Sequence, residues 1–122
     1  MRFIVSLLIS AAIVCGAAAH AHHSSAANFV TDRTAVIEGL VKEFWFANPH
    51  SRLYVDVTTE SGGIEEWMIE GNSRNNLIRR GWSQEKLQPG MAVTVTGRPS
   101  RDGSPAMEWE LVVTQDGEEL ER

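Results

Sequence analysis

Apolar and polar residues alternate along much of the chain with a period of two, which is typical of half-buried β-strands. The clearest case is the segment 52–59, where Leu53, Val55 and Val57 share one face and polar or aromatic residues occupy the other. Residues with high β-propensity dominate four further segments in the same way. These segments are 34–47, 64–70, 91–99 and 106–114. The pattern therefore predicts five strands.

Two of these strands carry more detailed expectations. Gly39, inside the first strand, predicts a bend or a bulge, because glycine weakens a regular strand. In the last strand, alternation predicts one buried face, formed by Met107, Trp109, Leu111 and Val113.

The pattern changes to a helical one between the third and fourth strands. Ser73 is placed as an N-cap, Leu77 and Ile78 as buried contacts, and Gly81 just past the helix end. The element order is then β-β-β-α-β-β, which is typical of a small five-stranded OB-like barrel over 34–114. An open five-stranded sheet with one helix packed on it is the alternative.

The first 21 residues have the layout of a secretory signal: Arg2, then an apolar run, then small residues. The run is too short for a membrane span. Small residues at positions −3 and −1 allow cleavage before His22, the cut we expect, or before His20 as the alternative. We therefore expect an exported protein, periplasmic or secreted, with no membrane span after cleavage.

The ends of the mature chain are polar. Residues 22–33 hold few core-forming side chains and are predicted to form a flexible leader, and the acidic tail 115–122 is expected to fray. Cys15 lies inside the signal, so the mature domain has no thiol. Without Arg2, ten basic residues face sixteen acidic ones, a net charge of −6. Since phosphate contacts need a positive face, we expect no nucleic-acid partner.

Histidines supply the most specific candidate chemistry, because three of the four lie at 20–23 and the fourth is His50. Imidazole and a free α-amine both suit copper and similar metals. Cleavage before His22 yields a free amine on His22, with His23 beside it; the amine, His22 and His50 together would resemble a histidine brace. Cleavage before His20 instead puts a histidine third, as in amino-terminal copper and nickel motifs. The alternative is that the histidines are ordinary polar residues, with His50 capping a turn or bonding to Ser51.

Aromatic residues are the second candidate, through Trp45 and Phe46 beside the turn-forming Asn48 and Pro49. Consecutive strand residues point to opposite faces, so one of the two rings is expected to be exposed for stacking a ligand. Large rings on strands are more commonly core residues.

Catalytic arrangements are not indicated. The carboxylates Asp56, Glu65, Glu66 and Glu70 have no spacing that fixes an acid–base pair, and a solvated face explains them. No nucleophile elbow or phosphate-binding loop is present. We therefore expect a binding module and not an enzyme, with a copper-dependent oxidative activity as the lesser alternative.

Several motifs together resemble a known family of small exported bacterial proteins. They are HHS at 22–24, NPHS at 48–51, EEWMIEGNSRNNLIRRGWS at 65–83 and LQPGMAVTVTGRPSRDGSP at 87–105. This combination resembles the domain-of-unknown-function family 6152. The resemblance implies an exported β-rich domain and no established activity, partner or cofactor. It carries over only the HHS and NPH positions, and Ser25 departs from it by standing where a bulkier apolar residue is expected.

Overall fold

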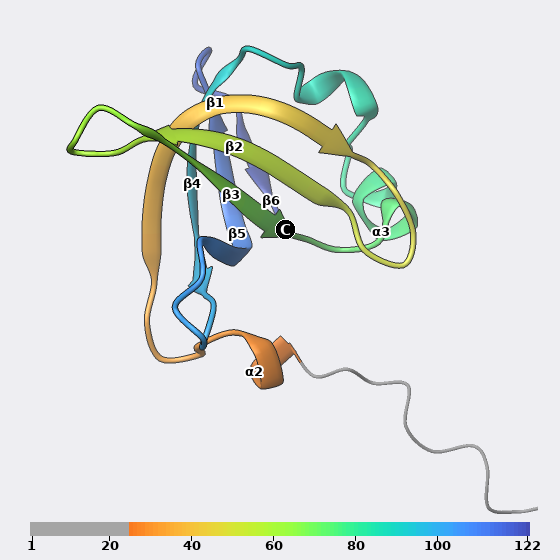
Figure 1. Ribbon diagram of the computed structural model, residues 1–122. Helices are drawn as coiled ribbons and strands as arrows, with labels where there is room; N and C mark the ends of the chain where they lie inside the picture. Colours follow the sequence, from red (N-terminus) through yellow and green to blue (C-terminus); the bar gives the residue numbers. More distant parts are fainter. Residues whose placement is uncertain (1–24) are drawn as a thin grey trace, which may run out of the picture.

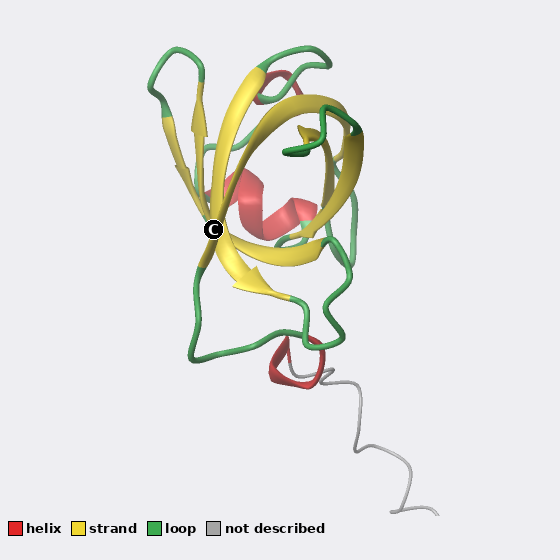
Figure 2. Ribbon diagram, turned by 60° about the vertical axis from the view of Figure 1, so that its left-hand side comes forward, coloured by secondary structure: helices red, strands yellow, loops and turns green. Residues whose placement is uncertain are grey.

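The computed structural model describes residues 25–122, in which five strands curve into a barrel (Figures 1 and 2). The strands are β1 (Ala35–Trp45), β2 (Arg52–Thr58), β3 (Ile64–Glu70), β4 (Ala92–Pro99) and β5 (Ala106–Thr114). Neighbours pair antiparallel in the order β3-β2-β1-β4-β5, and a parallel pairing of β3 with β5 closes the ring. This is the strand order of an OB barrel, so the barrel prediction is confirmed over the open sheet.

Two short helices connect β3 to β4. They are α3 (Arg74–Arg79) and the 3-10 helix η1 (Gln84–Lys86). The Ser73 hydroxyl accepts a backbone hydrogen bond as the predicted N-cap, and Leu77 is fully buried. Ile78 was expected to be buried as well, which is wrong: a one-turn-and-a-half helix turns only one face to the barrel. No helix within residues 25–122 is long and apolar enough to cross a membrane.

Inward-facing side chains from all five strands meet in one core around Trp109. Its indole ring stacks on Trp82, with 5.4 Å between the ring centroids. The strand residues of this core are Ile37, Val41, Phe44, Leu53, Val55, Ile69, Val93, Val95, Met107, Trp109 and Val112.

Two irregularities bend the barrel at places that the alternating pattern does not show. The β1–β2 register shifts between Val41 and Glu43 and not at Gly39. Gly39 instead allows β2 to approach closely, because a Cβ there would lie 2.4 Å from the Asp56 carbonyl oxygen. In β5, Trp109 pairs with Gly97 and Leu111 pairs with the adjacent Thr96 of β4, so β5 has one extra residue, a bulge, at Glu110.

The β5 bulge reverses the faces that alternation predicts for the end of the strand. Met107 and Trp109 are buried, as expected, but beyond the bulge Val112 is buried. The prediction that Leu111 and Val113 continue the face of Trp109 is therefore wrong, because one extra residue moves later side chains to the other face.

The leader is folded onto the barrel wherever the structure describes it. Helix α2 (Ser25–Asn28) precedes Phe29 and Val30, which are both buried. The Val30 N–H donates to the Pro99 carbonyl (2.9 Å), and Arg101 Nε donates to the Ala26 carbonyl (2.7 Å). The prediction of a flexible leader over 22–33 is thus wrong from Ser25 onward, because Phe29 and Val30 bury apolar area against the barrel.

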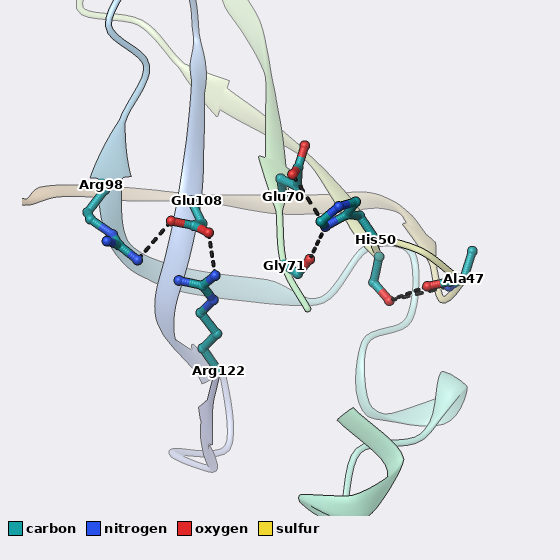
Figure 3. Close-up of polar contacts among 8 residues, drawn as sticks. Ala47, His50, Glu70, Gly71, Arg98, Glu108 and Arg122 are labelled. Atoms are coloured by element: carbon teal, nitrogen blue, oxygen red, sulfur yellow. Dashed lines mark hydrogen bonds and ion pairs between the residues drawn. The ribbon is translucent and has the colours of Figure 1, made fainter. Parts of the chain in front are cut away.

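The acidic tail also forms structure. Strand β6 (Glu119–Glu121) pairs antiparallel with β5, and Leu120 is buried. The side chain of Arg122 forms an ion pair with the buried Glu108, which also pairs with Arg98 at 2.8 Å (Figure 3). The prediction that the tail frays is wrong, since these contacts hold residues 119–122 on the barrel.

Replacing Glu108 by glutamine tests the strength of this ion-pair cluster. Removing the carboxylate charge leaves Arg98 and Arg122 without a compensating negative charge. Both arginines are partly exposed, so water reduces this cost. We expect Glu108→Gln to lower the free energy of unfolding by about 2–3 kcal/mol in urea titrations. The control is Glu110→Gln on the same strand; Glu110 is exposed, so the change should cost less than about 0.5 kcal/mol. Equal effects in the two variants would contradict the structural role of Glu108.

The β4–β5 turn that holds the leader depends on an ionised carboxylate. The Ser100 hydroxyl, together with Ser104, donates to Asp102 and lowers the pKa of that carboxyl from 3.8 to about 2. A pKa lowered by folding contributes stability above the unfolded-state value, about pH 4, and the contribution is lost as the pH falls through about 2. We expect an NMR titration of the Asp102 carboxyl carbon to show a midpoint near pH 2. Ser100→Ala should raise this midpoint, and an unchanged midpoint would contradict the assigned cause.

Candidate functional site

The loop between β1 and β2 is pinned against the end of β3. Ser51 is fully buried, and its hydroxyl donates to the Ala47 carbonyl at 3.2 Å, which closes the loop (Figure 3). The Ser51 N–H donates to the Asn72 carbonyl (3.0 Å), and the Gly71 N–H donates to the Ser51 carbonyl (2.9 Å). The loop therefore has a fixed position relative to residues 71–72.

Helix α3 fixes the other side of the loop. The Asn48 side chain accepts from the Asn75 N–H (3.2 Å) and donates to the Asn75 side-chain oxygen (3.3 Å). The Arg74 N–H donates to the Ala47 carbonyl at 2.9 Å. Asn48, a predicted ligand-binding residue, is thus engaged in holding the loop, whereas Pro49 is exposed after a cis peptide bond.

His50 lies on this loop with its side chain 48% exposed, and its ring meets the end of β3 through one nitrogen. Nδ1 is 3.4 Å from the Gly71 carbonyl oxygen and 3.5 Å from Oε1 of Glu70 (Figure 3). A carbonyl oxygen only accepts hydrogen bonds, so the contact places the proton on Nδ1. In the neutral ring, Nε2 then keeps its lone pair, which is how metal-binding histidines are commonly oriented.

The alternative role for His50, a bond to Ser51, is not what the structure shows, because the Ser51 hydroxyl bonds to Ala47. The other predicted metal ligands, His22 and His23, lie outside the described residues. Within 25–122, no three His, Cys, Asp or Glu side chains converge as a metal site. The described part therefore brings together one imidazole and one carboxylate, those of His50 and Glu70.

A pocket of about 310 Å³ separates the leader from the barrel wall next to this pair. Its lining includes Ala27 and Phe29 from the leader side, and Met68 and Glu70 from β3. Glu70 therefore faces the leader pocket and also contacts His50. Glu70 is therefore a neighbour of both the His50 loop and the pocket that the described start of the leader lines.

The aromatic pair beside the loop has one exposed and one half-buried ring, with Trp45 at the end of β1 and Phe46 just after it. Trp45 is 49% exposed, and the Arg52 guanidinium lies 5.2 Å from its ring centroid. Phe46 is half-buried, packs on Phe44 at 5.3 Å, and has Arg74 over its ring at 5.8 Å. The prediction that one ring is exposed is confirmed, and that ring is Trp45.

Sequence patterns alone did not reveal the partners of His50. Glu70 was expected to lie on a solvated face, and no pattern marked Gly71 as a neighbour of His50. A usable signal lies in the hairpin between β2 and β3: its register pairs Thr58 with Ile64 and therefore Arg52 with Glu70. Continuing that register beyond the strands brings the loop before Arg52 to the residues after Glu70.

Comparisons with known proteins define the fold and the family. The fold is similar to the solved structure titled "Crystal Structure of mitochondrial single-stranded DNA binding proteins from S. cerevisiae, Rim1 (Form2)". The TM-score is 0.52 at 12% identity, covering 68% of this chain and 93% of that chain, and at this identity the likeness shows the fold alone. No curated protein matches the chain.

The family assignment rests on the sequence itself. A family model matches residues 10–107, a span that includes the His50 loop, Glu70 and most of the barrel. The matched family has no described activity. The chain belongs to this family of unknown function, DUF6152.

Proposed function

We propose that this protein is an exported binding module that holds copper, or a similar late first-row metal, between its mature amino terminus and His50. The ligands are the new α-amine, the imidazole of His22 or His23, and Nε2 of His50. The protein acts as a metal binder in the periplasm or outside the cell, and not as an enzyme.

The orientation of His50 carries this proposal. Its Nδ1 faces the Gly71 carbonyl and the Glu70 carboxylate, and its half-exposed ring leaves Nε2 available. A carboxylate or carbonyl on the second nitrogen fixes the tautomer of a metal-binding histidine and raises its basicity.

The position of the leader gives the second support. Ala27 lines the pocket that Glu70 also lines, and the chain from Ala27 back to His22 spans five residues. The chain is helical from Ser25 to Asn28, so only the three residues from Ser25 back to His22 can extend; at about 3.3–3.6 Å per residue, they give His22 a reach of roughly 11 Å from Ser25. The proposal requires the terminus to use this reach past the pocket that Ala27 and Glu70 line.

Ligand chemistry favours copper among the metals. Neutral nitrogen ligands suit copper, nickel and zinc, and Cu²⁺ is the most strongly bound of the divalent first-row ions. The mature domain has no cysteine, so a thiolate zinc or iron–sulfur site is not available to it.

A second function is favoured by the exposure of Trp45 under Arg52. This pair could stack a small ligand or a protein partner beside Pro49 without any metal. The single-stranded DNA named for the similar structure is not part of our proposal. The outward faces of β2 and β3 carry Asp56, Glu66 and Glu70, which would repel phosphates.

A copper titration of the mature protein tests the metal proposal. The full chain would be expressed with its own signal, its amino terminus identified by mass spectrometry, and Cu²⁺ titrated against a competing chelator. We expect one tight equivalent. Glu70→Leu removes a group that holds His50 without binding the metal, so it should weaken copper affinity by ~10–100-fold. His50→Ala, or one alanine added before His22, removes a ligand itself and should weaken copper affinity by more than this.

Two matched controls make the titration specific. Glu66→Leu removes a carboxylate from the same strand, and Trp45→Ala removes the exposed ring; both should leave copper affinity unchanged. Tight binding that survives His50→Ala would contradict a shared site and point to the terminus alone. Loss of a partner on Trp45→Ala, with no effect of a chelator, would support the stacking function instead.

A further inference from the structure

A groove of about 660 Å³ lies on the outer surface where β1 changes partners, away from the His50 loop. Leu40 is the switch point: it pairs with Asp56 of β2 and with Ala92 of β4. On one side of Leu40, β1 follows β4, and on the other side it follows β2. The two neighbouring strands diverge at this bend, and the space between them forms the groove.

The groove exposes more apolar surface than a solvated face requires. Leu40 is 52% exposed and Ile64 is 71% exposed, and both line the groove. Val36, which precedes Leu40 by four residues on β1, is also exposed on the same face of the strand. Clustered exposed apolar side chains mark interaction surfaces more often than scattered ones do.

The charge around these apolar residues is negative. Glu38 and Asp56 line the groove, and Glu66 lies opposite Asp56 on β3. The neighbouring Lys42 forms an ion pair with Glu66. Glu66, and to a lesser extent Asp56, raise the pKa of Lys42, which shows that the carboxylates at this site favour a cation.

The strand edge beside the groove is open along part of its length. β3 pairs with β5 only through Met68, Ile69 and Glu70, so the first part of the strand, beginning at Ile64, pairs with β2 alone. Unpaired strand edges are where extended segments add to a sheet. Ile64, the first residue of this open edge, also lines the groove.

We infer that the groove is a docking site for an extended segment of a partner protein that carries both basic and apolar side chains on the face it turns to the groove. Its apolar side chains would cover Leu40 and Ile64, and its basic side chains would reach Glu38 and Asp56. These four groove residues lie on the same outward face of the sheet, so the side chains that meet them must come from every second residue of the segment. Charge complementarity selects a cationic partner over this acidic protein itself.

Peptide titration monitored by NMR tests this inference on the mature protein. The probe is a blocked heptapeptide, Lys-Ser-Leu-Ser-Lys-Ser-Val, whose lysine and apolar side chains share one face when the peptide is extended. The controls replace every lysine by glutamate, or every apolar residue by serine. We expect saturable amide shifts centred on Leu40, Asp56 and Ile64, and binding at least about tenfold weaker for either control peptide.

Variants assign the binding to the groove. The double substitution Leu40→Thr and Ile64→Thr places threonine, a residue with high β-propensity, at two exposed strand positions, so the barrel should be retained, as its NMR spectrum will show. It should weaken the probe by about tenfold, whereas Ile78→Thr, an equally exposed site on α3, should have no effect.

Three outcomes would overturn the inference. Shifts that map outside the groove would do so, as would equal binding of the glutamate peptide. The third is concentration-dependent self-association in sedimentation, abolished by the double variant, without peptide binding. That result would make a second copy of this chain the occupant. Copper titration of the double variant is independent of all three, since neither substituted residue contacts His50.

Discussion

The contact between Gly71 and the ring of Trp109 determines how the end of β3 meets the rest of the molecule. A Cβ at position 71 would lie 2.0 Å from the indole carbons, so only glycine lets the backbone rest on the core ring. From this position the Gly71 N–H bonds to Ser51, and its carbonyl faces His50. The largest buried side chain of the barrel thus supports, through one glycine, the loop that carries the candidate ligand.

The same arrangement holds the His50 side of the candidate site in place. Ser51 and Asn48 hold the loop against β3 and α3, so His50 has a fixed backbone. The described start of the leader is anchored by the buried Phe29 and lines the pocket that Glu70 also lines. Fixed ligands lose less entropy on binding a metal, so this scaffold favours the affinity that the proposed copper site requires.

Strand periodicity predicted the barrel because each strand has one buried face and the helix is marked by a serine cap and a glycine end. The period could not reveal the β5 bulge, since Glu110 looks like any outward residue until its partner on β4 is known. Strand β6 was missed for a similar reason: an acidic tail becomes ordered only through long-range contacts, such as that of Arg122 with Glu108. His50 was recognised as a candidate from its residue type, whereas its partners depend on pairing between β2 and β3.

The most direct test of the central claim is pulsed EPR of the mature protein loaded with one equivalent of Cu²⁺. If Nε2 of His50 binds copper, its remote Nδ1, which faces Gly71, should modulate the electron spin echo. His50→Ala should then remove one imidazole contribution while leaving that of the amino-terminal histidine. Identical modulation in the two proteins would show that His50 does not bind the metal, and the account of this site would be wrong.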